Sequence, residues 1–133
     1  LAPQWLALAE GVHRQLRTAL PADYAATLRG VFRDGGRMCV AVDEEAVRGV
    51  AVYRTQTNTF SGRFLYVDDL VTDDRHRSQG VGRLLFDHIE SRARELGCGS
   101  IQLDSGTQRQ RAHKFYFREG MTISSFKFGK SLK

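Results

Sequence analysis

The stretch DDRHRSQGVGRLL, residues 73–85, leads from a charged segment through two closely spaced glycines into an apolar helical pattern. Gly80 and Gly82 lie where the helix should begin, with Arg77 and Arg83 beside them. The first N–H groups of a helix have no partner within it and carry the positive end of its dipole, so they bind phosphate oxygens well. Glycine lets the backbone approach an anion, and arginine adds charge-assisted hydrogen bonds. A plain loop-to-helix junction uses glycine similarly, so the stretch alone leaves both interpretations open.

Two common phosphate-binding loops do not fit this spacing. A dinucleotide-binding loop needs a third glycine three residues after Gly82, where the chain has Leu85. A P-loop needs four residues between its glycines, followed by Lys and then Ser or Thr, and this sequence has no such pattern here. Any anion bound at this junction is therefore held by another type of site.

The segments on either side of this loop predict an α/β domain with a mixed sheet. Apolar residues recur at helical spacing over residues 5–20, 22–32 and 81–96. Short apolar or β-branched runs predict strands at 38–42, 50–58 and 63–72, of which the first is expected to be buried on both faces and to form a hairpin with the second. A strand at 100–104, a helix at 108–119 ended by Gly120 and a final strand at 121–128 complete the order. Residues 65–103 should then form a right-handed parallel crossover.

Composition describes an ordinary globular chain. With 133 residues, 41% hydrophobic and 26% charged, residues 1–133 are expected to form a single domain. No apolar run approaches the roughly 18 residues of a membrane span, and nothing resembles a signal peptide, so we expect no membrane partner and a cytoplasmic protein. The printed chain opens at Leu1 without a methionine, which leaves room for a preceding segment.

The charged residues, cysteines and histidines limit the classes of ligand that the sequence predicts. A net charge of +5, with arginines crowded between Arg75 and Arg118, fits an anionic ligand. Nucleic acid would give the same sign, but the sequence shows neither an aromatic-basic RNA signature nor a helix-turn-helix pattern, so no nucleic-acid partner is expected. Two cysteines among apolar or small residues predict neither a disulfide nor a metal site, and His76 and His88 lack companion ligands.

Two separated segments together resemble the GNAT superfamily of acyl-CoA-dependent N-acetyltransferases. The family pattern Arg/Gln-x-x-Gly-x-Gly/Ala is matched from Arg77 to Gly82, and Arg83 continues it as in many members. A later family segment, in which a helix carries Phe/Leu-Tyr and ends in Gly-Phe, is matched by Ala112, Phe115, Tyr116, Gly120 and Met121. The resemblance runs from about residue 37 to the C-terminus and implies the GNAT fold, although the strand that usually precedes the first helix has no counterpart here.

The resemblance implies acetyl-CoA as the acetyl donor, held in a gap between the strands at 65–72 and 101–104, with no metal. Family members bind the pantetheine arm through strand backbone groups and the pyrophosphate through loop amides. A family asparagine before the tyrosine helix is replaced by Arg109, which can meet a phosphate instead. The residues assigned to the cofactor in this way are Leu70, Val71, Thr72, Arg77, Ser78, Gln79, Gly80, Val81, Gly82, Arg83 and Arg109.

Acetyl transfer needs a neutral amine, a polarised thioester carbonyl and a proton for the departing thiolate. A backbone N–H near Leu70 can polarise the carbonyl, and Tyr116 matches the general acid of the family. Asp68 and Asp69 lie on one strand and should face opposite sides, so that only one reaches the site; both are assigned to amine binding. Asp69 is favoured for amine binding or water-mediated deprotonation, followed by Asp104. Each carboxylate can instead cap a turn or pair with an arginine.

The resemblance implies transfer of an acetyl group from acetyl-CoA to a primary amine, by direct attack in a ternary complex. A small-molecule amine is the favoured acceptor, and a protein lysine or N-terminus is the alternative. A non-catalytic CoA-binding sensor is a further alternative of a different class, against which Tyr116 and the strand carboxylates argue. Homodimers are common in the family, which makes a homodimer an expectation, although the sequence identifies no interface.

Overall fold

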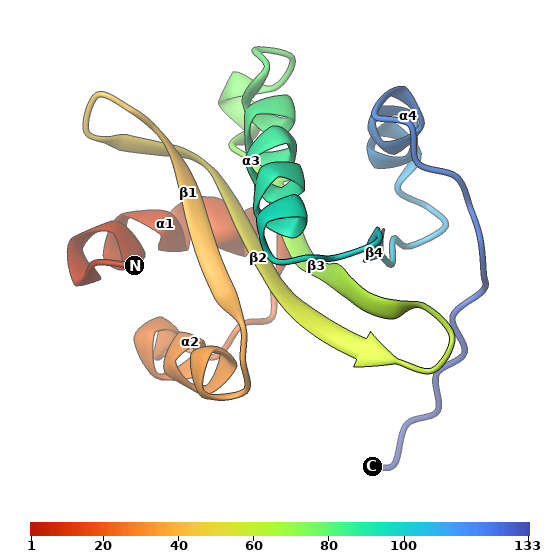
Figure 1. Ribbon diagram of the computed structural model, residues 1–133. Coiled ribbons are helices and arrows are strands. Elements are labelled where there is room, and N and C mark those ends of the chain that lie inside the picture. Colours follow the sequence, from red (N-terminus) through yellow and green to blue (C-terminus); the bar gives the residue numbers. More distant parts are fainter. The chain divides into compact units, whose positions relative to one another are not determined.

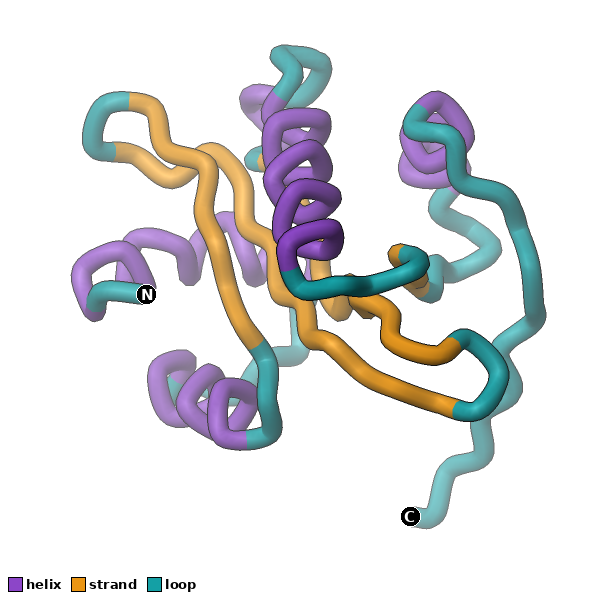
Figure 2. Tube along the Cα trace, viewed as in Figure 1, coloured by secondary structure: helices purple, strands orange, loops and turns teal.

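The computed structural model covers residues 1–133 and consists of two compact parts, Leu1–Leu103 and Asp104–Lys133. In the first part the helices and strands follow the predicted order (Figure 1). They are α1 (Pro3–Leu16), α2 (Tyr24–Arg33), β1 (Arg37–Asp43), β2 (Ala46–Asn58), β3 (Gly62–Thr72), a 3-10 turn (Asp74–His76), α3 (Val81–Glu95) and β4 (Ile101–Leu103). The second part contains α4 (Gln110–Arg118), and loops connect the elements of both parts (Figure 2).

The sheet is mixed, as the sequence predicted. Its strand order is β1-β2-β3-β4, with β1 and β2 antiparallel, β2 and β3 antiparallel, and β3 and β4 parallel. The predicted hairpin and the parallel step from β3 through α3 to β4 are therefore confirmed. No helix of the chain combines the length and the apolar character that crossing a bilayer demands.

Two apolar clusters cover the two faces of the sheet. In one, Leu85, Ile89 and Ala93 of α3 pack against the strands, and in the other Ala9 and Val12 of α1 do so. Figure 1 shows α3 in front of the strands and α1 behind them. The helical stripes seen in the sequence are thus the faces that bury apolar area, which is the main stabilising contribution to a fold of this kind.

Strand β1 lies at the edge of the sheet but is covered on both sides over most of its length. Cys39 and Ala41 face the cluster of α3, whereas Met38 and Val40 face the cluster of α1. Val42, near the hairpin turn, is 41% exposed. The prediction of burial on both faces holds fully only at Ala41, holds in part for the half-buried residues 38–40, and is wrong at Val42.

Strand β3 contains one residue more than its partner, and this extra residue is Asp68. Val52 of β2 lies opposite Asp69, but the next residue, Tyr53, lies opposite Val67. A β-bulge of this kind interrupts the alternation of side chains along a strand. Two consecutive residues can then point to the same face.

The carboxylates of Asp68 and Asp69 both face the side of the sheet covered by α1 and α2. Asp69 bonds to His13 of α1, and Asp68 bonds to Arg54, which also donates to the carbonyl oxygen of Asp34 just after α2. The prediction that the two carboxylates face opposite sides is therefore wrong. It assumed a regular strand, and the bulge at Asp68 makes this strand irregular.

The second part, Asp104–Lys133, is built around α4. The helix ends as predicted at Gly120, where the Gly120 N–H donates to the carbonyl oxygen of Phe117 and the Met121 N–H donates to that of Tyr116. His113 bonds through Nε2 to the carbonyl oxygen of Gly106, at 2.9 Å, and so ties the helix to the loop before it.

The predicted final strand at 121–128 is wrong, because these residues form neither helix nor strand. The segment has the β-branched and aromatic residues of a strand, but the four-stranded sheet does not include it. Its large apolar side chains stay exposed, at 71% for Ile123, 82% for Phe126 and 92% for Phe128. Strand propensity reflects packing against neighbouring strands, so composition alone does not produce a strand.

Gly49 of β2 allows α3 to lie close to the sheet. A Cβ at this position would meet Val81 Cγ1 at 2.7 Å, Leu85 Cδ1 at 2.8 Å and the Val71 carbonyl oxygen at 3.3 Å. Val81 begins α3, so the absence of a side chain at Gly49 sets how closely the start of that helix approaches β2 and β3.

We therefore expect Gly49→Ala to lower the free energy of unfolding by about 1–3 kcal/mol, because an overpacked core must shift α3. Urea denaturation measures this change. Gly11→Ala is the matched control, since a Cβ at Gly11 of α1 meets nothing within 4 Å. That substitution should raise stability by about 0.5–1 kcal/mol through helix propensity. Equal stability of the two variants would show that the close contact at Gly49 does not set the distance between α3 and the sheet.

Candidate active site

The loop between β3 and α3 is anchored at its first residue. Asp73 is 1% exposed, and its carboxylate accepts hydrogen bonds from Gln15 Nε2 at 3.2 Å and from the Arg75 backbone N–H at 3.3 Å. Its own N–H donates to the Arg48 carbonyl oxygen, and Gln15 Oε1 accepts from the Asp74 N–H. Burial raises the pKa of Asp73, but these hydrogen bonds outweigh it, so the pKa lies below its ordinary value.

The other end of this loop presents the N-terminus of α3. Gly80 is the N-cap residue, with φ of 82°, a left-handed conformation that glycine adopts without strain. No side chain caps the helix, and no acidic residue lies in its first turn. The first intrahelical bond of this end runs from the Leu84 N–H to the Gly80 carbonyl oxygen. The preceding amides of the first turn therefore have no intrahelical acceptor, which is the arrangement that binds anions.

The loop residues before the helix are accessible. Residues 77–80 are exposed, and Ser78 has φ of 65°, an uncommon value for a residue other than glycine. Arg83 is also exposed, and its Nε lies 3.9 Å from the Asp87 carboxylate, so this ion pair is weak. Of the two interpretations of the glycine loop, the uncapped helix end with arginines around it favours the anion site.

Strand β3 runs past the end of its partner β4. The two strands pair only from Leu65 opposite Ile101 to Val67 opposite Leu103, whereas β3 continues to Thr72. The side chain of Val71 is buried in the α1 cluster. The Val71 side chain is thus turned away from solvent, and the assignment of residues 70–72 to the cofactor through their backbone groups stays a prediction.

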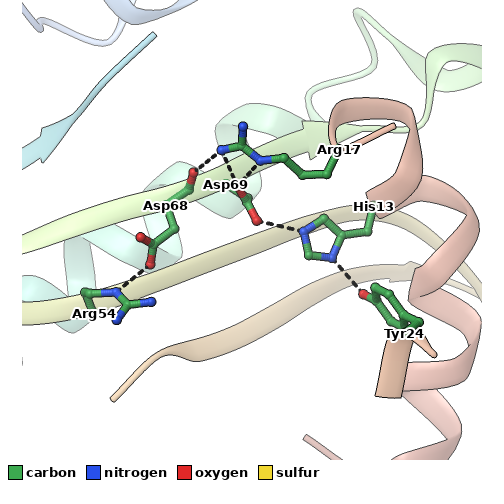
Figure 3. A network of polar contacts seen from close by, with 6 residues as sticks. All are labelled: His13, Arg17, Tyr24, Arg54, Asp68 and Asp69. Atoms are coloured by element: carbon green, nitrogen blue, oxygen red, sulfur yellow. Dashed lines mark hydrogen bonds and ion pairs between the residues drawn. The ribbon is translucent and has the colours of Figure 1, made fainter. Parts of the chain in front are cut away.

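Asp69 stands at the centre of a polar network that joins three elements (Figure 3). Its Oδ2 lies 2.7 Å from His13 Nε2 on α1, and its Oδ1 accepts from Arg17 Nε at 2.7 Å. The other ring nitrogen of His13, Nδ1, lies 2.7 Å from the Tyr24 hydroxyl on α2. The network therefore connects the first two helices to the bulge of β3.

The charges of this network fix its hydrogen-bond directions. Burial raises the pKa of Asp69, but hydrogen bonds from His13 and Arg17 and the charge of Arg17 outweigh it, so the pKa is lower than usual. Burial, together with the Glu10 and Asp69 carboxylates, raises the pKa of Tyr24 to about 12. An ionised carboxylate only accepts, so His13 Nε2 carries a proton; in the neutral ring, Nδ1 then accepts from Tyr24.

Asp68 forms a second ion pair beside this network. Its Oδ2 accepts from Arg54 Nε at 2.8 Å, and its backbone carbonyl oxygen accepts from Arg17 Nη2 at 2.9 Å. Both predicted carboxylates of β3 are therefore paired with arginines, one of the two alternatives left open by the sequence. The lowered pKa makes Asp69 a weaker base than an ordinary aspartate and favours a role as a fixed negative charge.

In the second part of the chain, Tyr116 and Arg109 are electrostatically linked. Burial raises the pKa of Tyr116, and the charge of Arg109 with a hydrogen bond from it opposes this rise. The phenol thus stays protonated at neutral pH and can donate a proton. Arg109 is the N-cap residue of α4, and Asp104 is an exposed residue directly after β4. Their assigned roles in catalysis and cofactor binding stay predictions.

Sequence reasoning missed three residues in and just after α1 that bond to Asp69 and to Asp73: His13, Gln15 and Arg17. A signal for His13 existed, because it lies four residues after Ala9 on the buried face of an amphipathic helix. A polar residue on such a face needs partners when buried. Those partners lie in other elements, so the sequence did not name them. No group of three or more His, Cys, Asp or Glu side chains is arranged to hold a metal ion.

The lowered pKa of Asp69 predicts a pH-dependent contribution to stability. A carboxyl group whose folded pKa is below its unfolded value of about 3.9 stabilises the fold above that pH and loses the effect as the pH falls through the folded pKa. Asp69→Asn should lower the free energy of unfolding at pH 7 by about 1–3 kcal/mol, and the difference from wild type should shrink in acid.

Urea denaturation across the acidic range checks this expectation. Asp87→Asn is the matched control, because the Asp87 side chain is 61% exposed on α3. It should change stability by no more than about 0.5 kcal/mol at any pH. A deficit of Asp69→Asn that stays constant down to the lowest pH would contradict the assignment.

Comparisons with known proteins support the same class of enzyme. A sequence model of the acetyltransferase (GNAT) family matches residues 4–121. The uncharacterized N-acetyltransferase YhdJ of Bacillus subtilis is 35% identical over 119 residues, which cover 87% of this chain and 84% of that protein. The aminoalkylphosphonate N-acetyltransferase of Salmonella typhimurium is 36% identical over 66 residues, which cover 50% of this chain and 43% of that protein.

Solved structures share the fold at lower sequence identity. An acetyltransferase of Trypanosoma brucei has a TM-score of 0.82 at 22% identity, covering 99% of this chain and 96% of that one. AAC(6')-Iy, solved with a bisubstrate analogue of CoA and acetylneamine, has a TM-score of 0.88 at 15% identity, covering 100% and 95%. The family match across both parts of the chain and the relative from Bacillus subtilis agree with the site: this chain belongs to the GNAT family of N-acetyltransferases.

Proposed function

We propose that residues 1–133 act as one N-acetyltransferase domain, which transfers the acetyl group of acetyl-CoA to a primary amine of a small molecule. The observation that carries this proposal is the N-terminus of α3, which follows a glycine loop and has no side-chain cap. Its amides suit the pyrophosphate of CoA, and Arg77 and Arg83 add positive charge. The Asp73 anchor keeps the loop in place, so the cofactor meets a preformed site.

The reaction proceeds by direct attack in a ternary complex. The neutral amine nitrogen forms a bond to the thioester carbonyl carbon, and the carbon–sulfur bond breaks. The backbone N–H near Leu70 stabilises the negative charge that develops on the carbonyl oxygen. The thiolate of CoA takes a proton from Tyr116, whose raised pKa keeps it protonated, and the proton lost by the amine passes to water. Asp69 supports this step as a fixed negative charge near the amine.

A small amine is favoured by what related proteins act on. The Salmonella typhimurium relative acetylates aminoalkylphosphonates, and the bisubstrate analogue in AAC(6')-Iy carries acetylneamine. The test is a screen for free thiol release from acetyl-CoA across polyamines, aminoglycosides, aminophosphonates, amino acids and peptides. Release with small amines supports the proposal, and release with peptides alone would replace it by protein acetylation. No release with any amine, despite acetyl-CoA binding, would favour a sensor.

Acetyl-CoA should stabilise the protein against thermal unfolding, because a ligand that binds only the native state shifts the equilibrium by about 2.7 kcal/mol at 100 times its Kd. Gly82→Leu should abolish this shift by placing a side chain where the pyrophosphate lies. Gly11→Leu, at an open position of α1, should retain it. A normal shift in Gly82→Leu would remove the loop from the cofactor site.

Tyr116→Phe should lower kcat by roughly 100-fold, the usual size of a general-acid effect, and leave the acetyl-CoA thermal shift unchanged. Steady-state kinetics with the best amine from the screen measure this. Phe117→Leu is the control on the same helix, because Phe117 is 54% exposed and has no assigned role. Full turnover by Tyr116→Phe would exclude the phenol as the proton donor.

A further inference from the structure

The Asp69 carboxylate has two partners with very different exposure. The His13 side chain, which bonds Oδ2, is 3% exposed, whereas the Arg17 side chain, which bonds Oδ1, is 51% exposed. The carboxylate itself is 13% exposed. One oxygen of Asp69 is therefore held from inside the protein, and the other is held by a side chain that lies half in solvent.

The bond to His13 is fixed by packing. The imidazole lies edge-on to the Tyr24 ring, with the ring centroids 5.6 Å apart, and both of its nitrogens are hydrogen-bonded. Breaking either bond leaves a buried polar group without a partner, which costs about 1–3 kcal/mol. His13 and Tyr24 therefore hold the orientation of the carboxylate.

The bond to Arg17 can be exchanged at much lower cost. Arg17 follows the last residue of α1 and is its C-cap residue. Its Nε and Nη2 approach the same oxygen of Asp69, at 2.7 and 2.6 Å. Arg17 Nη2 also donates to the carbonyl oxygen of Asp68, at 2.9 Å, but a half-exposed guanidinium can bond to water when the ion pair opens, whereas the buried imidazole cannot. An ammonium group has the same charge and equivalent N–H donors, so it can take the place of the guanidinium at Oδ1.

We propose that Arg17 occupies the position of the acceptor's ammonium group on Asp69, and that the acceptor displaces it while His13 and Tyr24 keep the carboxylate in place. This inference rests on the proposed acetyl transfer and deepens it: the acceptor binds as a cation. Arg17 is then a specificity-determining residue, and His13 and Tyr24 are positioning residues. The exchange makes and breaks no covalent bond, and the ammonium loses its proton to water before it attacks the thioester.

Arg17→Met tests the exchange, because it keeps an unbranched apolar side chain and removes the competing charge. The probe is the amine with the fastest thiol release in the screen. We expect KM for this amine to fall about threefold or more, as the energy of an exposed ion pair allows, with kcat and KM for acetyl-CoA unchanged. Arg94→Met is the matched control, since Arg94 is 78% exposed and only loosely paired with Glu90 on α3. Its kinetics should equal those of wild type.

His13 is tested by two replacements that differ in a single property. His13→Leu removes the donor to Asp69, whereas His13→Gln places an amide N–H near the position of Nε2. We expect kcat/KM for the amine to fall about tenfold or more in His13→Leu and to be largely restored in His13→Gln. A purely structural role would affect stability alone and leave kcat/KM equal in the two variants. The acetyl-CoA thermal shift identifies which variants are folded.

The outcomes separate this inference from the proposed function. An unchanged KM in Arg17→Met, with normal wild-type turnover, overturns the exchange and leaves acetyl transfer intact. A raised KM overturns it as well, and indicates that Arg17 binds an anionic group of the acceptor. If wild type shows neither turnover nor stabilisation by acetyl-CoA, the proposed function fails and the inference fails with it. If both His13 variants unfold, the KM of Arg17→Met decides alone, because the half-exposed Arg17 can be replaced without unfolding the protein.

Discussion

The extra residue in β3 determines which groups meet at the end of that strand. Without the bulge at Asp68, the two aspartates would face opposite sides of the sheet, and one of them would enter the apolar cluster beneath α3. An unpaired carboxylate there would face a large desolvation penalty. With the bulge, both carboxylates face the first two helices, where arginines and a histidine bond to them.

Two further constraints place the uncapped N-terminus of α3 relative to that bulge. The missing side chain at Gly49 lets the helix lie close to the sheet, and the buried carboxylate of Asp73 ties down the loop that leads into it. Neither group is itself expected to touch a substrate. Their contribution is preorganisation: a site that is already formed does not have to spend binding energy on ordering a loop.

Much of this architecture was readable from the sequence because local pattern and tertiary environment agree. The apolar stripe of α3 and the glycines after α3 and α4 mark elements whose type does not depend on distant residues. No local sequence pattern indicates the bulge at Asp68, because a bulge depends on how two strands pair. The bond between His13 and Asp69 joins residues 56 positions apart, and periodicity carries no information on such a contact.

Dependence on distant residues also explains why the strand prediction at residues 121–128 was wrong. It also determines which parts of the candidate site rest on the family resemblance alone. At residues 121–128, local composition favoured a strand, but a strand exists only with a partner. The loop at the start of α3 has a physical justification in its uncapped amides. For Tyr116 the physical justification is partial. Its surroundings explain why the phenol is protonated, but its role as proton donor to the CoA thiolate is inferred from the family pattern.

The end of α1 contacts both the loop before α3 and the carboxylate of Asp69. Gln15 holds the loop that is proposed to bind the cofactor, while His13 and Arg17 hold the carboxylate that is proposed to meet the amine. The two proposed binding events would therefore both act on the five residues 13–17. If either ligand moves α1, thermodynamic linkage requires that each changes the affinity of the other by the same factor. The strength of that coupling then becomes a property of this helix.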